Sequence, residues 1–275
     1  MTKTIAFTGG KGGTGKSTLA VALTLELSKK YKVLLVDCDV DCPNDHLLLN
    51  IKRNFLKNVL QRIPLFNLNK CIKCGLCSNV CKFNSIVTIK DNFPIFLPNQ
   101  CNGCGACNII CPLNAISFEN KSVGKIYFND DNSFHFLGGE LKINQPISEF
   151  IVNELNKEIQ KVKDNYDFII IDTAAGTHCP VIAAIKNVDE IFAVTEPTPF
   201  GAHDLEIILK LFRKIKKKGK VILNRSNIGN KKLIESIVQK YDTRIVFSVP
   251  FSKKIINFYT KSKPIIVPKI LSVIK

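Results

Sequence analysis

The chain has 275 residues, of which 45% are hydrophobic and 23% charged, and its formal net charge is +16. This balance is typical of a globular protein with a substantial core, and it excludes wholesale disorder. The apolar runs, such as FIIID at 168–172, are too short to span a membrane. No charged-then-apolar leader precedes the first apolar segment, so we expect a cytoplasmic protein.

The first forty residues predict a strand–helix–strand unit. TIAFT at 4–8 reads as a buried strand, and KSTLAVALTLELSKK at 16–30 has helical apolar spacing. KVLLVDCD at 32–39 reads as a second buried strand. Such a βαβ unit favours an α/β fold with a parallel sheet.

The turn between the first strand and the helix matches a phosphate-binding motif. GKGGTGKS at 10–17 has the form G-x-x-x-x-G-K-[ST], in the strand-to-helix context that a P-loop requires. Lys16 is expected to neutralise the β- and γ-phosphates of ATP, and Ser17 to bind Mg²⁺. The alternative is a glycine-rich turn without a ligand, which the matched context disfavours. The nucleotide contacts predicted in this loop are Gly10, Lys11, Gly12, Gly13, Thr14, Gly15, Lys16, Ser17 and Thr18.

A cysteine-rich segment follows, at about 64–120, and contains an internal repeat of 30 residues. Eight of the eleven cysteines occur there in two copies of C-x₂-C-x₂-C-x₃-C. This spacing is typical of bacterial ferredoxins with two [4Fe-4S] clusters, in which each motif gives its fourth cysteine to the other cluster. The alternative is two structural zinc sites. The predicted ligand sets are Cys71, Cys74, Cys77 and Cys111 for one cluster, and Cys101, Cys104, Cys107 and Cys81 for the other.

The remaining residues return to the α/β pattern. Residues 123–139 predict a hairpin around NDDN at 129–132. Alternating elements follow, with helices at 147–162, 204–215, 230–241 and 253–261 and strands at 166–173, 189–196, 220–225 and 243–251. We therefore predict a mostly parallel α/β P-loop NTPase domain formed by 1–63 and 121–275. An α+β ferredoxin-like domain at 64–120 is inserted into it.

Carboxylates stand at the ends of two predicted strands beside the phosphate loop. Asp37 and Asp39 follow one strand and Asp172 ends another, where parallel sheets bind ligands. A helix cap or a solvated loop carboxylate is the alternative for each.

The extra lysine in KGGTGKST, Lys11, resembles the deviant P-loop of the MinD/ParA family, which includes the nitrogenase iron protein. The resemblance implies that Lys11 reaches across a dimer to the partner's nucleotide, which makes Lys11, Lys16 and Asp39 the expected catalytic residues. VDCDVDCPN at 36–44 resembles the first switch, in which Asp39 would orient the attacking water and Asp37 would support Mg²⁺.

The same resemblance extends to later segments. IIIDTAAG at 169–176 resembles the second switch, with Asp172 holding Mg²⁺ through water and Gly176 sensing the γ-phosphate. Adenine contacts are implied for Asn224, Arg225 and Pro250. The nearly full-length pattern is similar to MinD-type ATPases that carry a ferredoxin insertion.

Three cysteines lie outside the repeat. Cys179 stands seven residues after Asp172, where the nitrogenase iron protein has a cluster ligand. The alternative for Cys179 is a buried thiol at a helix start. Cys38 and Cys42 flank Asp39 and are expected to be small buried thiols.

These features favour an ATPase whose dimer closure gates electron transfer, or release of a metal cluster, to a redox or metalloprotein acceptor. The dimer would be formed with a second copy or with a paralogue. The first alternative is a positioning ATPase that binds membrane or DNA and uses its clusters as sensors. The basic charge and the tail PKILSVIK at 268–275 support it. The second is a scaffold without turnover, which intact Lys11, Lys16 and Asp39 disfavour.

Overall fold

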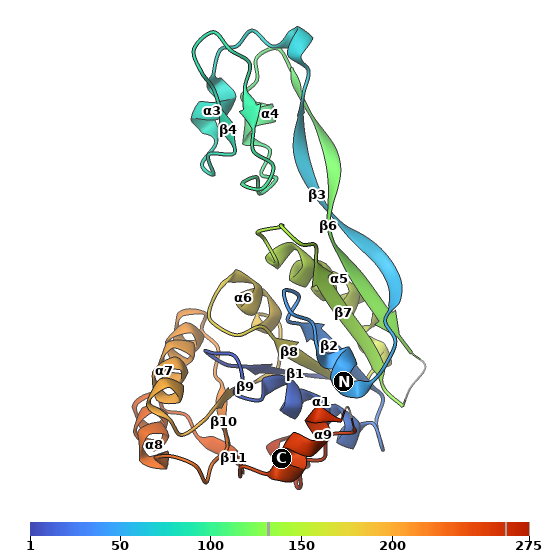
Figure 1. The fold of residues 1–275 in the computed structure, drawn as a ribbon, viewed down its shortest axis with the longest axis vertical. Helices are drawn as coiled ribbons and strands as arrows, with labels where there is room; N and C mark the ends of the chain where they lie inside the picture. Colours follow the sequence, from blue (N-terminus) through green and yellow to red (C-terminus); the bar gives the residue numbers. More distant parts are fainter. Residues whose placement is uncertain (131–132, 262, 275) are drawn as a thin grey trace.

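A nine-stranded sheet runs through the main part of the molecule, with strand order β11-β10-β9-β1-β8-β2-β7-β6-β3 (Figure 1). The structure is a computed structural model that describes residues 1–130, 133–261 and 263–274. Two residues of the expected NDDN turn, Asp131 and Asn132, and the last residue of the tail, Lys275, lie outside the described residues.

The centre of the sheet is parallel, and its strands are apolar on both faces. β1 (Lys3–Thr8) lies between β8 (Phe168–Thr173) and β9 (Glu190–Thr195). Continuous apolar runs of this kind are buried when helices cover both sides of a sheet. The mostly parallel α/β fold is thus confirmed. The other parallel strands are β2 (Val33–Cys38), β7 (His135–Leu141), β10 (Lys220–Asn224) and β11 (Ile245–Val249).

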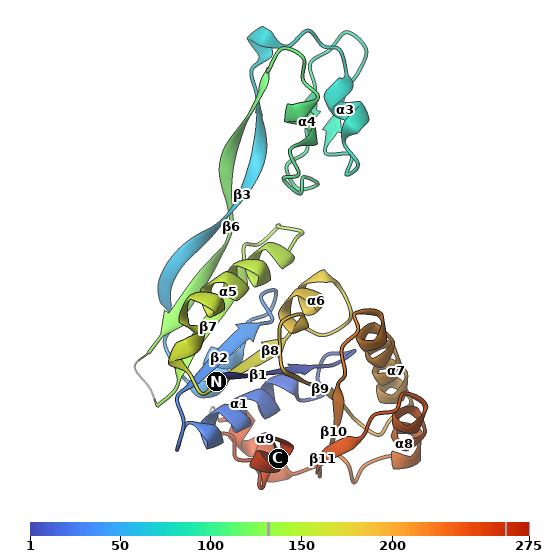
Figure 2. The same ribbon diagram turned by 180° about the vertical axis from the view of Figure 1, so that it is seen from behind.

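Helices cover the two faces unequally (Figures 1 and 2). One face packs against four helices, α5 (Glu149–Val162), α6 (Cys179–Ile185), α7 (Pro199–Lys214) and α8 (Lys231–Lys240). The other packs against α1 (Lys16–Leu27), the short α2 (Asp45–Leu49), α9 (Lys253–Thr260) and the 3₁₀ turn η3 (Ile270–Ile274). Among the described residues, no helix is both long and apolar enough to cross a bilayer.

One helix starts earlier than predicted, and another was not predicted at all. α7 begins at Pro199, five residues before the expected start, because the Thr198 hydroxyl accepts a hydrogen bond from the backbone N–H of Gly201 at 3.0 Å. Proline fits the first turn of a helix, where its missing N–H costs nothing. α6 was not predicted, since only seven residues form it.

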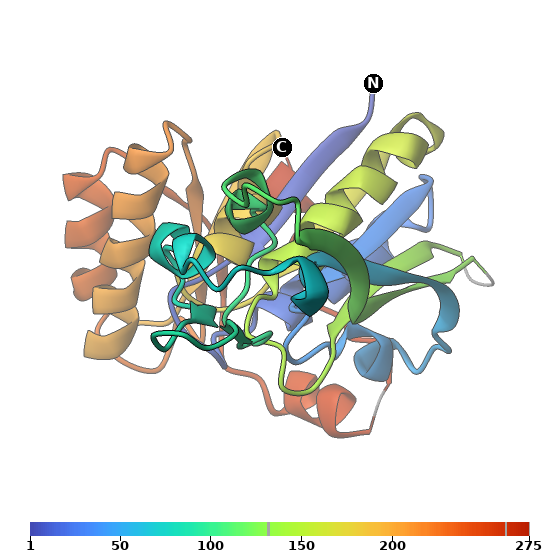
Figure 3. The same cartoon turned by 90° about the horizontal axis from the view of Figure 1, so that it is seen from above.

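A long two-stranded ribbon carries the cysteine-rich segment away from the sheet. β3 (Asn54–Phe66) pairs antiparallel with β6 (Ile116–Asn129) along its whole length, but β7 pairs only with residues 124–129 of β6. The outer half of the ribbon therefore projects beyond the sheet, and the cysteine-rich segment leans back from its tip above α6 (Figures 1 and 3). No strand was predicted at 54–66.

The ribbon is anchored where it leaves the sheet. The ammonium group of Lys57 forms ion pairs with Glu154, at 2.6 Å, and with Glu158, both on α5. An isolated pair of strands is marginally stable in water. Packing of α5 against β6 and β7 supplies the support that the pairing of β3 with β6 lacks on its own.

Close packing of α5 on the sheet depends on glycine at position 139. A Cβ atom there would lie 2.6 Å from Cγ2 of Ile151 and 2.8 Å from Cγ1 of Val40. We expect Gly139→Ala to lower the free energy of unfolding by about 2 kcal/mol, because the core must shift to admit the methyl group. Urea unfolding measures the change. Lys125→Ala, at an exposed position of β6, is the control and should have little effect; equal losses would contradict this packing.

Candidate functional site

The phosphate loop joins β1 to α1 at the carboxyl edge of the sheet. Gly13 and Gly15 adopt φ angles of 76° and 95°, a left-handed conformation that favours glycine. Lys16 is only 6% exposed, and its ammonium group donates to the backbone oxygen of Lys11 at 3.2 Å. The lysine therefore folds back over its own loop, with its charge beside the N-terminus of α1.

Ser17 and two buried aspartates meet beside this loop. The hydroxyl of Ser17 donates to Oδ2 of Asp172 at 2.6 Å. Asp37 accepts the backbone N–H groups of Asp39, Asn44 and Asp45 at 3.1–3.2 Å. A hydroxyl and carboxylates are the ligand types that suit a hard cation such as Mg²⁺.

Burial controls the protonation of these carboxyl groups. It raises the pKa of Asp172 to about 7, even though Ser17 and Lys16 favour the charged form. Burial, and then the nearby Asp172, also raise the pKa of Asp37. A divalent cation at this position would reverse the effect, because it stabilises the ionised carboxylates.

The two predicted switch segments lie against the phosphate loop. The backbone N–H of Gly176 donates to the oxygen of Gly9 at 2.9 Å, which brings the loop after β8 to the P-loop. Asp39 is half-buried, and burial raises its pKa although the charges of Lys16 and His178 lower it.

A cavity of about 390 Å³ opens next to the loop. Its size suits a small-molecule ligand. The Asn224 amide donates to the Thr14 backbone oxygen at 2.8 Å, so the cavity wall is tied to the P-loop. The predicted residues on the wall are Gly13, Gly15, Lys16, Ser17, Thr18, Asn224, Arg225 and Pro250. The wall also includes residues that were not predicted, namely Asn44, Phe251, Ile255, Ile256 and Val267. In the sequence, only the apolar residues that follow Pro250 could have indicated this part of the wall.

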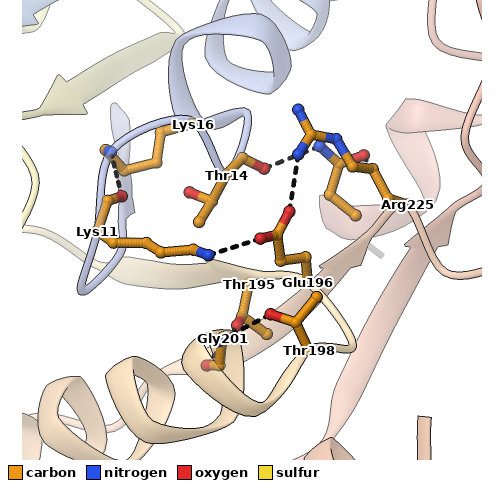
Figure 4. A network of polar contacts seen from close by, with 9 residues as sticks. Lys11, Thr14, Lys16, Thr195, Glu196, Thr198, Gly201 and Arg225 are labelled. Carbon is orange, nitrogen blue, oxygen red and sulfur yellow. Dashed lines mark hydrogen bonds and ion pairs between the residues drawn. The ribbon is translucent and has the colours of Figure 1, made fainter. Parts of the chain in front are cut away.

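Lys11 is held within its own chain (Figure 4). Its ammonium group lies 2.6 Å from Oε1 of Glu196, and Arg225 contacts Oε2 of the same carboxylate at 2.8 Å. Glu196 is 8% exposed and follows β9, next to β1 in the sheet. Burial raises the pKa of Glu196, but Lys11 and Arg225 outweigh it and hold that pKa below its usual value. Glu196 was not predicted.

The eight cysteines of the repeat line two small cavities in the crossed combination. Cys71, Cys74 and Cys77 share one cavity with Cys111 of the second motif. The other cavity brings Cys81 of the first motif to the three leading cysteines of the second, Cys101, Cys104 and Cys107.

The backbone repeats as the sequence does. Gly75 precedes α3 (Leu76–Val80) and Gly105 precedes α4 (Ala106–Ile109), with φ angles of 76° and 84°. Asn84 and Asn114 are likewise left-handed, at 51° and 48°. Backbone N–H groups also approach two of the sulfur atoms. Gly103 donates to Cys101 at 3.3 Å and Ala115 to Cys111 at 3.2 Å.

The other three cysteines are separate from these cavities. Cys38 is buried at the end of β2, as expected, but Cys42 is exposed in the following loop. Cys179 begins α6 and is exposed, so the expectation of a buried thiol there is wrong. Its helix packs on the sheet through later residues, such as Val181 and Ile185.

Comparisons with known proteins extend over nearly the whole chain. A model of the CobQ/CobB/MinD/ParA nucleotide binding domain matches residues 5–265. One uncharacterized protein of Methanocaldococcus jannaschii is 36% identical over 94% of this chain and 90% of its own length. A second from that organism is 33% identical over 90% of this chain and 84% of its own length.

Solved structures share the fold. The septum site-determining protein MinD of Pyrococcus horikoshii, complexed with Mg-ADP, has a TM-score of 0.57 at 20% identity, covering 96% of this chain and 87% of that one. The cell division ATPase MinD of Pyrococcus furiosus has a TM-score of 0.61 at 18% identity, covering 99% and 97%. At these identities the likeness shows the fold alone.

The charge of Glu196 is expected to contribute to stability. Glu196→Gln should lower the free energy of unfolding by about 1 kcal/mol at pH 7, because partly exposed ion pairs contribute on that order. Since the pKa of Glu196 is lowered in the folded protein, this contribution is full above the usual value of 4.5 and is lost as the pH falls through the folded pKa. Urea unfolding at pH 7 and in the acid range measures it.

The matched control for this substitution is Glu235→Gln. Glu235 forms an exposed ion pair with Lys231 at 3.3 Å on one helix face. It should change stability by less than about 0.5 kcal/mol. A loss in Glu196→Gln that persists unchanged in acid would show that charge is not its cause.

Proposed function

The chain belongs to the CobQ/CobB/MinD/ParA nucleotide-binding family, and from that premise we propose that it is an ATPase that carries two [4Fe-4S] clusters. The ATPase part rests on one observation above all. A buried Lys16 and Ser17 line a cavity of about 390 Å³, and Ser17 is hydrogen-bonded to the buried Asp172 beside it. The Mg-ADP complex of the archaeal MinD with the same fold supports this reading.

The residues divide the work of binding and hydrolysis. Lys16 and the backbone N–H groups of the loop bind the phosphates, and the cavity wall at Asn224 and Pro250 receives the base. Mg²⁺, when bound, neutralises charge on the phosphates, with Ser17, Asp172 and Asp37 as the residues that would hold it. Asp39 orients the attacking water.

Dimer formation is part of this proposal because of Lys11. Within one chain Lys11 is paired with Glu196. We infer that Lys11 leaves this partner to reach the nucleotide of a second subunit, as the family resemblance implies. The second subunit is another copy or a paralogue. The two relatives of this chain in one archaeon support the paralogue as an option.

The cluster proposal is supported by the two cysteine-lined cavities. Each combines three cysteines of one motif with the fourth of the other, the arrangement of two-cluster ferredoxins. Tetrahedral zinc, with bonds of about 2.3 Å, needs sulfur atoms about 3.8 Å apart. Among the described residues, only a group of three aspartates brings its ligand atoms all within 4.8 Å, so the cysteine sets are wider than a zinc site.

The ribbon links the two parts. β3 begins a few residues after α2, and the backbone N–H groups at the start of α2 are bound by Asp37 of the nucleotide site. A rearrangement of the first switch on nucleotide binding would therefore move the base of the ribbon. We propose that ATP-driven closure repositions the clusters and so gates electron or cluster transfer to a redox or metalloprotein acceptor.

The likeness to MinD supports a second candidate function. MinD proteins of the same fold are named for septum-site determination and cell division, and this observation favours a positioning ATPase more directly than a redox one. Here the protein would bind a membrane or DNA, and the clusters would report redox state. The net charge of +16 suits either anionic surface.

ATP turnover by anaerobically purified protein is the first test. Lys16→Ala and Asp39→Asn should each reduce turnover by at least about 100-fold, since they remove phosphate binding and water orientation. Lys29→Ala, at an exposed position in the turn after α1, is the control and should leave turnover unchanged. A wild-type protein that binds ATP without hydrolysing it would instead establish a scaffold.

Metal content and electron paramagnetic resonance test the clusters. The wild type should hold roughly eight iron atoms per chain. Cys101→Ser should lose about half of them, whereas Cys42→Ser, at an exposed cysteine outside both cavities, should lose none. Zinc in place of iron would contradict the cluster assignment.

Electron paramagnetic resonance of the dithionite-reduced protein, recorded with and without MgATP, decides between the two candidate functions. Signals from two interacting [4Fe-4S]⁺ clusters that change on addition of MgATP would support gated transfer. Signals that are indifferent to MgATP, together with ATP turnover stimulated by anionic vesicles or by duplex DNA, would support the positioning ATPase.

A further inference from the structure

Asp45 is a buried carboxylate to which the functions above assign no role. It is the first residue of α2 and is 0% exposed. Neither of its carboxylate oxygens has a hydrogen-bond partner within the described part of the chain. A buried acidic side chain left this way is unusual, because burying a charge without a partner is strongly unfavourable.

The side chain points at two other buried carboxylates. Asp37, Asp45 and Asp172 each place one oxygen so that all three lie within 4.8 Å of one another. Oδ1 of Asp172 also has no hydrogen-bond partner among the described residues. Unpaired acceptors from two of these residues therefore converge with Asp37, although α2, β2 and β8 are separate elements.

The charges nearby do not balance this group. Within the described part of the chain, Asp37 is contacted by backbone N–H groups and Asp172 by the Ser17 hydroxyl, so no basic side chain is paired with this group. Lys16 does act on Asp172, but its ammonium group donates to the Lys11 backbone oxygen. The described residues therefore leave three converging carboxylates without a cationic partner, and a bound cation would supply one.

We propose that Asp37, Asp45 and Asp172 form a site for a hard divalent cation, Mg²⁺ or Mn²⁺, which binds in the absence of nucleotide with Asp45 as a direct ligand. Carboxylate oxygens are the preferred ligands of these ions, at about 2.0–2.2 Å. Oxygens on opposite sides of such an ion lie about 4 Å apart. The three carboxylate oxygens, which all lie within 4.8 Å of one another, are therefore close enough to share one ion.

This site differs from the nucleotide-bound magnesium described above. Both sites share Asp37 and Asp172, but the nucleotide-bound ion would also be held by the phosphates and Ser17, whereas here Asp45 supplies the third carboxylate and no nucleotide is needed. The inference does not rest on ATP hydrolysis. Its consequence is structural, since the ion would tie α2 of the first switch to β8 of the second before nucleotide binds.

Binding of Mn²⁺ to nucleotide-free, cluster-loaded protein tests the proposal. Room-temperature electron paramagnetic resonance detects free Mn²⁺, so its loss on addition of protein measures binding. The wild type should bind about one Mn²⁺ per chain, and Asp45→Asn should bind it at least tenfold more weakly. Asp41→Asn is the matched control, because it removes one exposed carboxylate from the same loop and should bind like the wild type.

Thermal unfolding of the wild type gives a second readout that depends on no variant. Mn²⁺ should raise the unfolding temperature without nucleotide, because the ion binds only the folded site. The proposal is overturned if wild-type protein binds Mn²⁺ only when ATP is present, since the three carboxylates would then not form a site on their own. It is also overturned if Asp45→Asn binds like the wild type, or if Asp41→Asn loses as much affinity as Asp45→Asn. ATP turnover plays no part in these outcomes.

Discussion

Concentration of buried charge at the carboxyl edge of the parallel sheet governs the rest of this structure. β2 and β8 pair with Asp37 directly beside Asp172, and the P-loop after the neighbouring β1 brings Lys16 to the same edge. Charges at such density are unfavourable in a dry interior unless ligands, backbone donors or ions complete them. The same charges suit this edge to its ligands, because Lys16 can bind phosphate and the aspartates can bind a divalent cation.

The first switch connects this edge to the cysteine-rich segment. Asp37 binds the backbone at the start of α2, and β3 begins shortly after α2 ends. β3 is at once the edge strand of the sheet and one half of the ribbon that carries the eight cysteines. A small displacement at the base of a long ribbon becomes a larger one at its tip, which is the physical basis of the proposed coupling.

Glu196 connects the P-loop to the strands on the other side of β1. By pairing with both Lys11 and Arg225 it joins the loop to the strand that borders the cavity. In the dimer proposed above, Lys11 would give up this pair to reach the second subunit, and the free energy of the pair would then be part of the free energy of dimer closure.

The sequence by itself determined the features whose residues are contiguous. The P-loop, the aspartates at the ends of β2 and β8, and the duplicated cysteine spacing each contain their whole pattern in a short segment. β3 escaped prediction because exposed apolar residues, among them Phe55, Leu56 and Leu60, break its alternation. Glu196 and Asp45 escaped for a different reason. Glu196 pairs with Lys11, which is 185 residues away in the sequence. Asp45 meets Asp37 and Asp172, which lie on two separate strands. Only the order and register of the strands decide which distant charged side chains meet. Burial of those side chains then decides whether they need backbone donors, an opposite charge or a bound ion.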